Sequence, residues 1–201
     1  MTARTTTAER VFARLREEIL TGRMAPGSQH SIYRLADELG VSRTPVREAL
    51  QRLERLGLVV MYPSRYTEVT EVTPDVVQQT LEFAGYQWGL ATRMGLQRMT
   101  GAERAMLATL AEHMYTALDD ARALSDSRWA VFSFASARSG NEQHHALIAD
   151  WGMALLRNLR GWTVAVDDRE RMLQVYRDFH DAVVDGDPDE AERLTRAMYY
   201  V

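Results

Sequence analysis

The stretch VSRTPVREALQRLERLG, residues 41–57, predicts a short amphipathic helix around which the rest of the fold is organised. Its apolar residues recur every three or four positions, which places them along one inward-facing stripe. These residues are Val46, Leu50, Leu53 and Gly57. Arg43, Arg47 and Gln51 are four positions apart, so they project together from the opposite face. The stretch therefore predicts a helix that packs on one side and displays arginines on the other.

Residues suited to helix termini mark both ends of this helix. Ser42 is expected to cap its start, and Pro45 is tolerated because the first turn does not need its missing N–H. Gly57 suits the C′ position, where a left-handed conformation ends a helix. The first turns display Arg43 and Thr44, and arginine pairs bidentately with guanine when such turns enter a major groove. The alternative interpretation is an ordinary solvated helix face.

The segments before this helix predict the remainder of a helix-turn-helix. Apolar spacing favours a helix over residues 6–21, which Gly22 and the Pro26–Gly27 pair then end. A second helix is expected over residues 31–39, with a serine at its start and Gly40 at the turn that follows. Two short helices joined by a tight glycine turn form a helix-turn-helix.

The residues after the helix predict a β-hairpin. Residues 58–62 are rich in β-forming side chains, and residues 67–72 alternate between polar and apolar. Residues 63–65 supply the turn and place Arg65 at its tip, where it could reach a phosphate or the minor groove. A helix-turn-helix followed by a hairpin is a winged helix.

A domain boundary is expected at Thr73 and Pro74, which suit the cap and the first position of a new helix. Beyond this point the sequence predicts only helices. Their expected ranges are 74–99, 101–124, 127–139, 142–160, 168–184 and 188–200. The predicted fold class is mainly α, with a winged helix-turn-helix domain at residues 1–72 and an all-helical bundle of about six helices at residues 73–201.

Composition limits the class of protein. The chain has 201 residues, of which 46% are hydrophobic, so it can form one large domain or two small ones. It has no cysteine, no apolar run long enough to span a membrane and no apolar leader, so a cytoplasmic protein is expected. The net charge is −4, but residues 1–72 carry more arginine than acid while residues 73–201 are acidic. This asymmetry favours two domains with different partners.

The N-terminal motifs resemble those of GntR-type transcription regulators of the FadR subfamily. The resemblance rests on ILTGRMAPG at residues 19–27 and on LADELGVSRTPVREALQRLERLGLV at residues 35–59. The helical part is similar to the FCD ligand-binding domain, through SGN at residues 139–141 and YRDFHDAVVDGDPDEAERL at residues 176–194. The resemblance implies a homodimer that binds a two-fold DNA operator as a repressor, with a small organic effector in the helical domain.

The resemblance also implies which residues meet the DNA. Bases would be read by Arg43 and Arg47, whereas Ser42, Thr44 and Arg65 would hold phosphates. The full set of implied contacts is Tyr33, Arg34, Ser42, Arg43, Thr44, Arg47 and Arg65. Two positions depart from the family pattern: Ile32 follows Ser31 where an acid is usual, and Tyr66 follows Arg65 where a glycine is usual. Since tyrosine disfavours positive φ, we expect the wing turn to differ from that of the family.

Many FCD domains bind a metal through an aspartate and three histidines. Matching the motifs to this chain places Arg128, Phe132, Tyr176 and Met198 at or near those four positions. These side chains are not a divalent-metal ligand set, and an arginine repels a cation. We therefore expect no metal and no other cofactor. A ligand pocket without a metal would need apolar walls with a few polar side chains that anchor the ligand. Candidate anchors for a carboxylate or acyl effector are Arg93, Arg128, Tyr176 and Tyr199.

The histidines give little support for catalysis. His144 and His145 are adjacent, so on a helix they point in different directions and cannot chelate one ion together. The sequence contains no catalytic Ser–His–Asp order, phosphate-binding glycine loop or zinc motif, so no catalytic residues are expected. Three hypotheses follow: an effector-responsive DNA-binding regulator, a regulator whose helical domain only dimerises, and a metalloenzyme or hydrolase.

Overall fold

The computed structural model describes residues 6–201, which divide into two compact units. The first ends at Thr73, and the second runs from Pro74 to Val201. Each unit has its own core and is described by itself below. The first five residues of the predicted N-terminal domain lie outside the described range.

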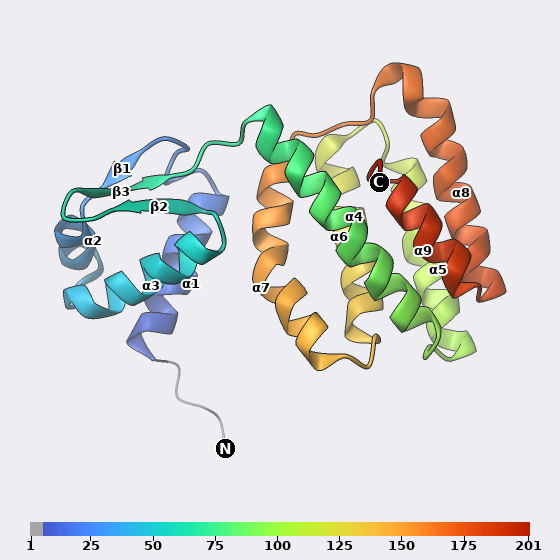
Figure 1. Cartoon of the computed structure of the whole chain (residues 1–201), viewed down its shortest axis with the longest axis horizontal. Helices are drawn as coiled ribbons and strands as arrows, with labels where there is room; N and C mark the ends of the chain where they lie inside the picture. Colours follow the sequence, from blue (N-terminus) through green and yellow to red (C-terminus); the bar gives the residue numbers. More distant parts are fainter. Residues whose placement is uncertain (1–5) are drawn as a thin grey trace. The chain divides into compact units, whose positions relative to one another are not determined.

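Three helices form the body of the first unit (Figure 1). They are α1 (Thr7–Leu20), α2 (Ile32–Leu39) and α3 (Arg43–Arg55). Helix α1 packs against α3 through side chains that are almost completely buried, among them Leu15, Ile19, Leu50 and Leu53. Val46, Leu50 and Leu53 of the predicted stripe are therefore on the inner face of α3, whereas Gly57 is exposed and lies beyond the end of the helix.

A small antiparallel sheet completes this unit. Its strands are β1 (Gln29–His30), β2 (Val59–Tyr62) and β3 (Tyr66–Val69), in the order β1-β3-β2. The predicted hairpin is confirmed as β2 and β3, with Val59 opposite Val69. Strand β1 was not predicted, because two residues are too short to show an alternating pattern. It pairs with β3, and the Gln29 side chain donates to the Glu68 carboxylate at 3.0 Å.

The second unit contains the predicted all-helical bundle. Its helices are α4 (Pro74–Leu96), α5 (Gly101–Thr116), α6 (Ala121–Ala137), α7 (Glu142–Leu159), α8 (Arg169–Asp185) and α9 (Pro188–Ala197), with a short 3-10 turn, η1 (Val166–Asp168), before α8. Helices α4 and α9 lie side by side along much of their length (Figure 1). No helix within residues 6–201 is both long and apolar enough to cross a membrane.

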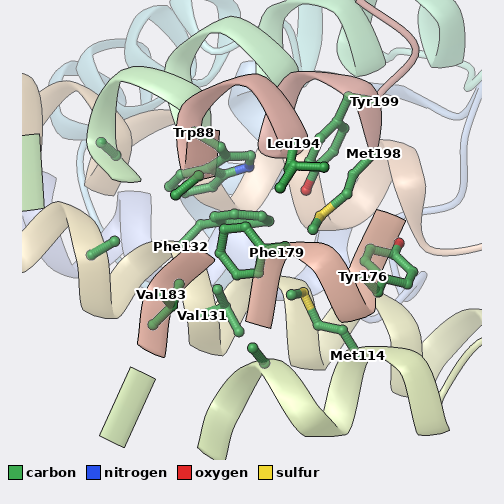
Figure 2. Packing of buried hydrophobic residues seen from close by; sticks show 14 of the residues in the cluster. Trp88, Met114, Val131, Phe132, Tyr176, Phe179, Val183, Leu194, Met198 and Tyr199 are labelled. Carbon is green, nitrogen blue, oxygen red and sulfur yellow. The ribbon is translucent and has the colours of Figure 1, made fainter. Parts of the chain in front are cut away.

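Aromatic side chains fill the centre of the bundle. Phe132 of α6 is completely buried and lies between Trp88 and Phe179, as Figure 2 shows. Its ring centroid is 5.5 Å from that of Trp88 and 6.1 Å from that of Phe179. Tyr199 approaches the same ring at 5.9 Å. These residues come from three helices and the C-terminal segment. The Phe132 ring therefore contacts several different parts of the bundle.

The boundary between α5 and α6 differs from the prediction. The sequence favoured one helix through Leu124 and a start of the next at Ser127, whereas α5 ends at Thr116 and α6 starts at Ala121. The Asp120 side chain accepts hydrogen bonds from two backbone N–H groups at 2.9 and 3.0 Å, which caps α6. Apolar periodicity continues across this short break, so spacing alone did not reveal it.

Candidate DNA interface and effector site

Helix α3 is tied down at its C-terminal end, whereas its first turn is exposed. Ser42 is the N-cap residue, as predicted, but its side chain makes no capping hydrogen bond, so its hydroxyl is not used by the helix. Gly57 has a φ of +68° and ends the helix in the left-handed region. The Glu54 side chain accepts a hydrogen bond from the backbone N–H of Met61 at 2.8 Å. This bond ties the end of α3 to the start of the wing.

All seven side chains expected to meet DNA are exposed on the first unit. Arg43, Arg47 and Arg65 form no ion pair with any residue in the range 6–201. Arg34 differs, because its guanidinium lies 3.2 Å from the carboxylate of Glu38 one turn later. Arg43, Arg47 and Arg65 are therefore available to an outside anion.

A groove separates α3 from the wing and from the start of α2. Its volume is about 480 Å³, and its walls include Tyr33, Arg47 and Arg65. The structure thus brings three of the seven predicted residues to one concave surface. Gln51 also lines this groove. The sequence placed Gln51 on the same helix face as the arginines, but the family resemblance did not include it among the contacts.

The wing turn carries its positive φ at Ser64 rather than at Tyr66. Ser64 has a φ of +58°, and the N–H of Arg65 donates to the carbonyl of Tyr62 at 3.1 Å. Tyr66 is in strand β3, where its ring lies 4.8 Å from that of Tyr62 across the hairpin. Tyr66 therefore does not need a positive φ in this turn, and two tilted tyrosine rings form the stem of the wing.

Tyr33 is not an isolated surface residue, because it contacts helix α3. The Arg43 guanidinium carbon lies 5.0 Å from the centre of the Tyr33 ring, which is a cation–π distance. Tyr33 is 65% exposed, so the contact lies on the surface of the unit. The ring restricts the positions that the Arg43 side chain can adopt before DNA is bound.

We predict that Tyr33→Leu weakens specific DNA binding by about two- to five-fold, the range expected from loss of an exposed cation–π contact of about 0.5–1 kcal/mol. Fluorescence anisotropy with a labelled operator measures this change. Tyr33→Phe is the matched control, since it keeps the ring and removes only the hydroxyl. Equal weakening by both variants would assign the effect to the hydroxyl instead.

In the second unit, Arg128 is a buried cation surrounded by aromatic rings. It is 4% exposed, and its guanidinium carbon lies 4.5 Å from the Trp162 ring centre and 4.7 Å from that of Tyr199. Its Nε and Nη2 donate to the Tyr176 hydroxyl at 2.9 and 2.5 Å, and Nη2 also donates to the Met198 carbonyl at 3.1 Å. No carboxylate in the range 6–201 pairs with it.

The phenol that accepts these bonds is neutral. Burial raises the pKa of Tyr176, although the nearby Arg128 opposes this shift. Burial likewise raises the pKa of Tyr199. Neither hydroxyl therefore supplies a negative charge to balance the guanidinium at neutral pH.

A small cavity adjoins Arg128. Its walls include Trp88, Trp129, Trp162 and Tyr199, and it holds about 20 Å³ of space. That volume accommodates about one water molecule. Two of the four predicted effector anchors, Arg128 and Tyr199, line this cavity, and Tyr176 is connected to it through Arg128.

Arg93, the fourth predicted anchor, lies elsewhere. It projects from α4 toward α9 and pairs with Asp189 at 2.8 Å and Glu192 at 3.0 Å. The Glu192 carboxylate, as a hydrogen-bond acceptor, raises the pKa of the Arg93 guanidinium. Arg93 does not line the cavity and serves to hold α4 and α9 together.

The positions that the resemblance matches to metal ligands meet in the structure, but their chemistry does not suit a metal. Arg128 is bonded to Tyr176 and to the Met198 carbonyl, and Phe132 lies one helical turn from Arg128. A guanidinium donates hydrogen bonds and cannot ligate a cation, and a phenyl ring has no donor atom. Within residues 6–201, no three His, Asp or Glu side chains are grouped so as to hold a metal ion.

We predict that dialysis against a chelator leaves the melting temperature of the protein unchanged. Removal of a structural metal would lower it, because binding of the metal contributes to folding. Differential scanning fluorimetry before and after dialysis provides the measurement, and elemental analysis of untreated protein is the control. A tightly held stoichiometric metal would contradict this account and favour a metalloenzyme.

Comparisons with known proteins divide the chain in a similar way. Residues 7–69 match the family of bacterial regulatory proteins described as the gntR family. Residues 89–200 match the FCD domain. The two matched segments lie on either side of Thr73, where the compact units meet.

Individual relatives agree with these matches. An HTH-type transcriptional regulator of Streptomyces ambofaciens is 44% identical over 64 residues, which are 32% of this chain and 27% of that protein. The regulator Rv0494 of Mycobacterium tuberculosis is 29% identical over 94% of this chain and 85% of its own length. The solved structure of Escherichia coli McbR/YncC covers 98% of this chain and 94% of its own, with a TM-score of 0.66 and 20% identity. That last similarity shows the fold.

An exposed recognition helix beside a wing, followed by a helical bundle, defines a DNA-binding transcription regulator. The chain belongs to the GntR family of bacterial regulatory proteins and carries an FCD domain.

Proposed function

We propose that this regulator acts as a homodimer of the FadR subfamily that binds a two-fold symmetric operator and represses transcription. A small organic effector, a carboxylate or acyl compound, binds in the FCD domain and changes the affinity for DNA. The protein has no enzymatic role in this proposal, and its DNA target places it in the cytoplasm.

The observation that carries the proposal is that Arg43 and Arg47 of α3 are exposed and form no ion pair within the described residues. Arg43 and Arg47 are one helical turn apart on the first turns of α3, and neither pairs with an acid among the described residues. Arg65 faces the same groove from the wing. Arginines so placed can pair with guanine edges, while the wing and Thr44 hold phosphates.

Genome-wide mapping of bound DNA tests this proposal. We expect enriched fragments to share one inverted-repeat sequence, because two copies of α3 related by a two-fold axis read the same half-site twice. Fragments without a common sequence would contradict specific binding. A single, non-repeated half-site would contradict the homodimer.

A second candidate is favoured by the small size of the cavity. About 20 Å³ is too little for an organic effector in the observed conformation, so the helical unit could serve only to dimerise. A thermal-shift screen of metabolites distinguishes the two candidates. Saturable stabilisation that follows about RT ln(1 + [L]/Kd) would exclude the dimerisation-only role.

A further inference from the structure

Arg128 stands at a position where many FCD domains have a metal ligand, but an arginine cannot bind a cation. Its positive charge suits an anionic ligand instead. We propose that Arg128 itself anchors the carboxylate of an aromatic monocarboxylate, and that Trp162 covers this site until the ligand enters. The inference rests on the proposed effector-binding function of the FCD domain. It supplies the chemical class of the ligand and the residue that recognises it.

Arg128 carries a buried positive charge that no carboxylate among residues 6–201 balances. A guanidinium that is 4% exposed has lost most of its hydration, and a buried charge without an opposite partner is costly. Its observed partners, the Tyr176 hydroxyl and the Met198 carbonyl, are both neutral. The carbonyl is at the end of α9, where the helix dipole offsets only part of the charge. A bound anion would balance the remaining positive charge of Arg128.

The Arg128 guanidinium has one nitrogen whose N–H groups are not used by the described residues. Nε and Nη2 of Arg128 are occupied, but Nη1 donates to no other residue in the range 6–201. Arg128 also lines the cavity. Nη1 can therefore donate to one oxygen of a carboxylate, and a charged donor binds an anion more strongly than a neutral amide or a hydroxyl.

The side chains that line the cavity indicate the charge of the ligand and the group next to its carboxylate. Arg128 is the only charged side chain on them within the described chain, which favours one negative charge over two. Three tryptophans and Tyr199 supply flat apolar surfaces. Trp88 and Trp129 pack edge to face with their ring centroids 5.8 Å apart. These surfaces suit an aromatic ring next to the carboxylate.

Trp162 differs from the other two tryptophans in its position on the chain. Trp88 and Trp129 are on helices α4 and α6, and Trp129 is packed so closely on α7 that a Cβ added at Gly152 would lie 2.0 Å from its ring. Trp162 lies instead in the segment 160–165 between α7 and η1, where its ring contacts the Arg128 guanidinium and the Tyr200 ring. Movement of this segment would enlarge the cavity without disturbing a helix.

The experiment titrates the full chain, free of DNA, with sodium benzoate and with its neutral analogue benzamide. Isothermal calorimetry measures affinity, and intrinsic tryptophan fluorescence reports on the cavity. We expect benzoate to bind saturably and at least ten-fold more tightly than benzamide. Phthalate, which adds a second carboxylate, should bind at least ten-fold more weakly than benzoate.

Arg128→Met keeps most of the side-chain volume and removes the charge. We expect it to reduce the preference for benzoate over benzamide to less than two-fold. Arg122→Met is the matched control, because Arg122 is an exposed arginine near the start of the same helix, and it should keep the preference. Arg128→Lys keeps a charge but loses the bonds that hold the guanidinium to the Tyr176 hydroxyl and the Met198 carbonyl, and it should bind benzoate more weakly than wild type. Circular dichroism confirms that each variant is folded.

The Trp162→Phe variant tests whether Trp162 covers the site. We expect it to remove most of the fluorescence change while calorimetry still detects benzoate. The inference is overturned if benzoate and benzamide bind equally, if neither binds at millimolar concentration, or if Arg128→Met and Arg128→Lys both leave benzoate affinity unchanged. DNA binding is measured separately, so a protein that binds its operator but ignores benzoate contradicts this inference and leaves the DNA-binding role intact.

Discussion

Replacing Arg43 and Arg47 together by alanine is expected to reduce specific operator binding to the level of binding to unrelated DNA. A bidentate arginine–guanine pair contributes about 1–3 kcal/mol of discrimination, so each single change should weaken binding by about five- to 150-fold. Both side chains are exposed on α3 and are free of ion pairs within the described chain. Their loss should therefore leave the fold of the unit intact.

Fluorescence anisotropy with operator and with scrambled DNA measures the specificity lost. Arg122→Ala is the control, since it removes the same charge from an exposed site on α6 of the helical unit. It should change operator affinity by less than two-fold. If the control and the Arg43→Ala variant weaken binding equally, the α3 arginines contribute only net charge and do not read bases.

Phe132→Ala is expected to destabilise the helical unit by about 3–5 kcal/mol, because it removes a fully buried ring and leaves a cavity. Trp88, Phe179 and Tyr199 would each lose the ring they pack against. For a unit of this size the midpoint of thermal unfolding should fall by on the order of 10 °C. Circular dichroism at increasing temperature gives the midpoint.

Val184→Ala provides the matched control for this loss. Val184 is also apolar and helical, but it is 54% exposed on α8, so its truncation should change stability by less than about 0.5 kcal/mol. A Phe132→Ala variant that melts within about 2 °C of wild type would contradict the central position assigned to this ring.

Local patterns in the sequence were sufficient to predict much of the fold. The stripe of Val46, Leu50 and Leu53 is the buried face of α3, and Gly57 ends that helix as expected. Such signals depend on residues a few positions apart, which a single sequence displays directly. The resemblance to a known family then linked the helix to DNA.

Features that depend on distant residues could not be predicted in the same way. Strand β1 exists because β3 pairs with it across about forty positions of sequence. The contact between Tyr33 and Arg43 joins two helices, and the positive φ at Ser64 depends on how the hairpin closes. None of these three features produces a periodic pattern in the sequence.

The candidate effector site in the helical unit also depends on contacts between residues that are distant in the sequence. Arg128, Tyr176 and Tyr199 were each suspected as anchors, but their mutual contacts span up to seventy positions of sequence. Arg93 was grouped with them by residue type, and the structure pairs it instead with Asp189 and Glu192. Trp162 is not among the predicted anchors, because its contact with Arg128 joins residues that lie far apart in the sequence.

The central claim is that α3 lies in a major groove with Arg43 against a guanine. Methylation interference on the mapped operator tests it most directly, because methylation at guanine N7 blocks the acceptor that arginine uses. The account predicts that methylation of one guanine in each half of the inverted repeat prevents binding by wild type, and that Arg43→Ala is insensitive to the same methylation. Wild-type binding that tolerates methylation at every guanine of the operator would contradict it.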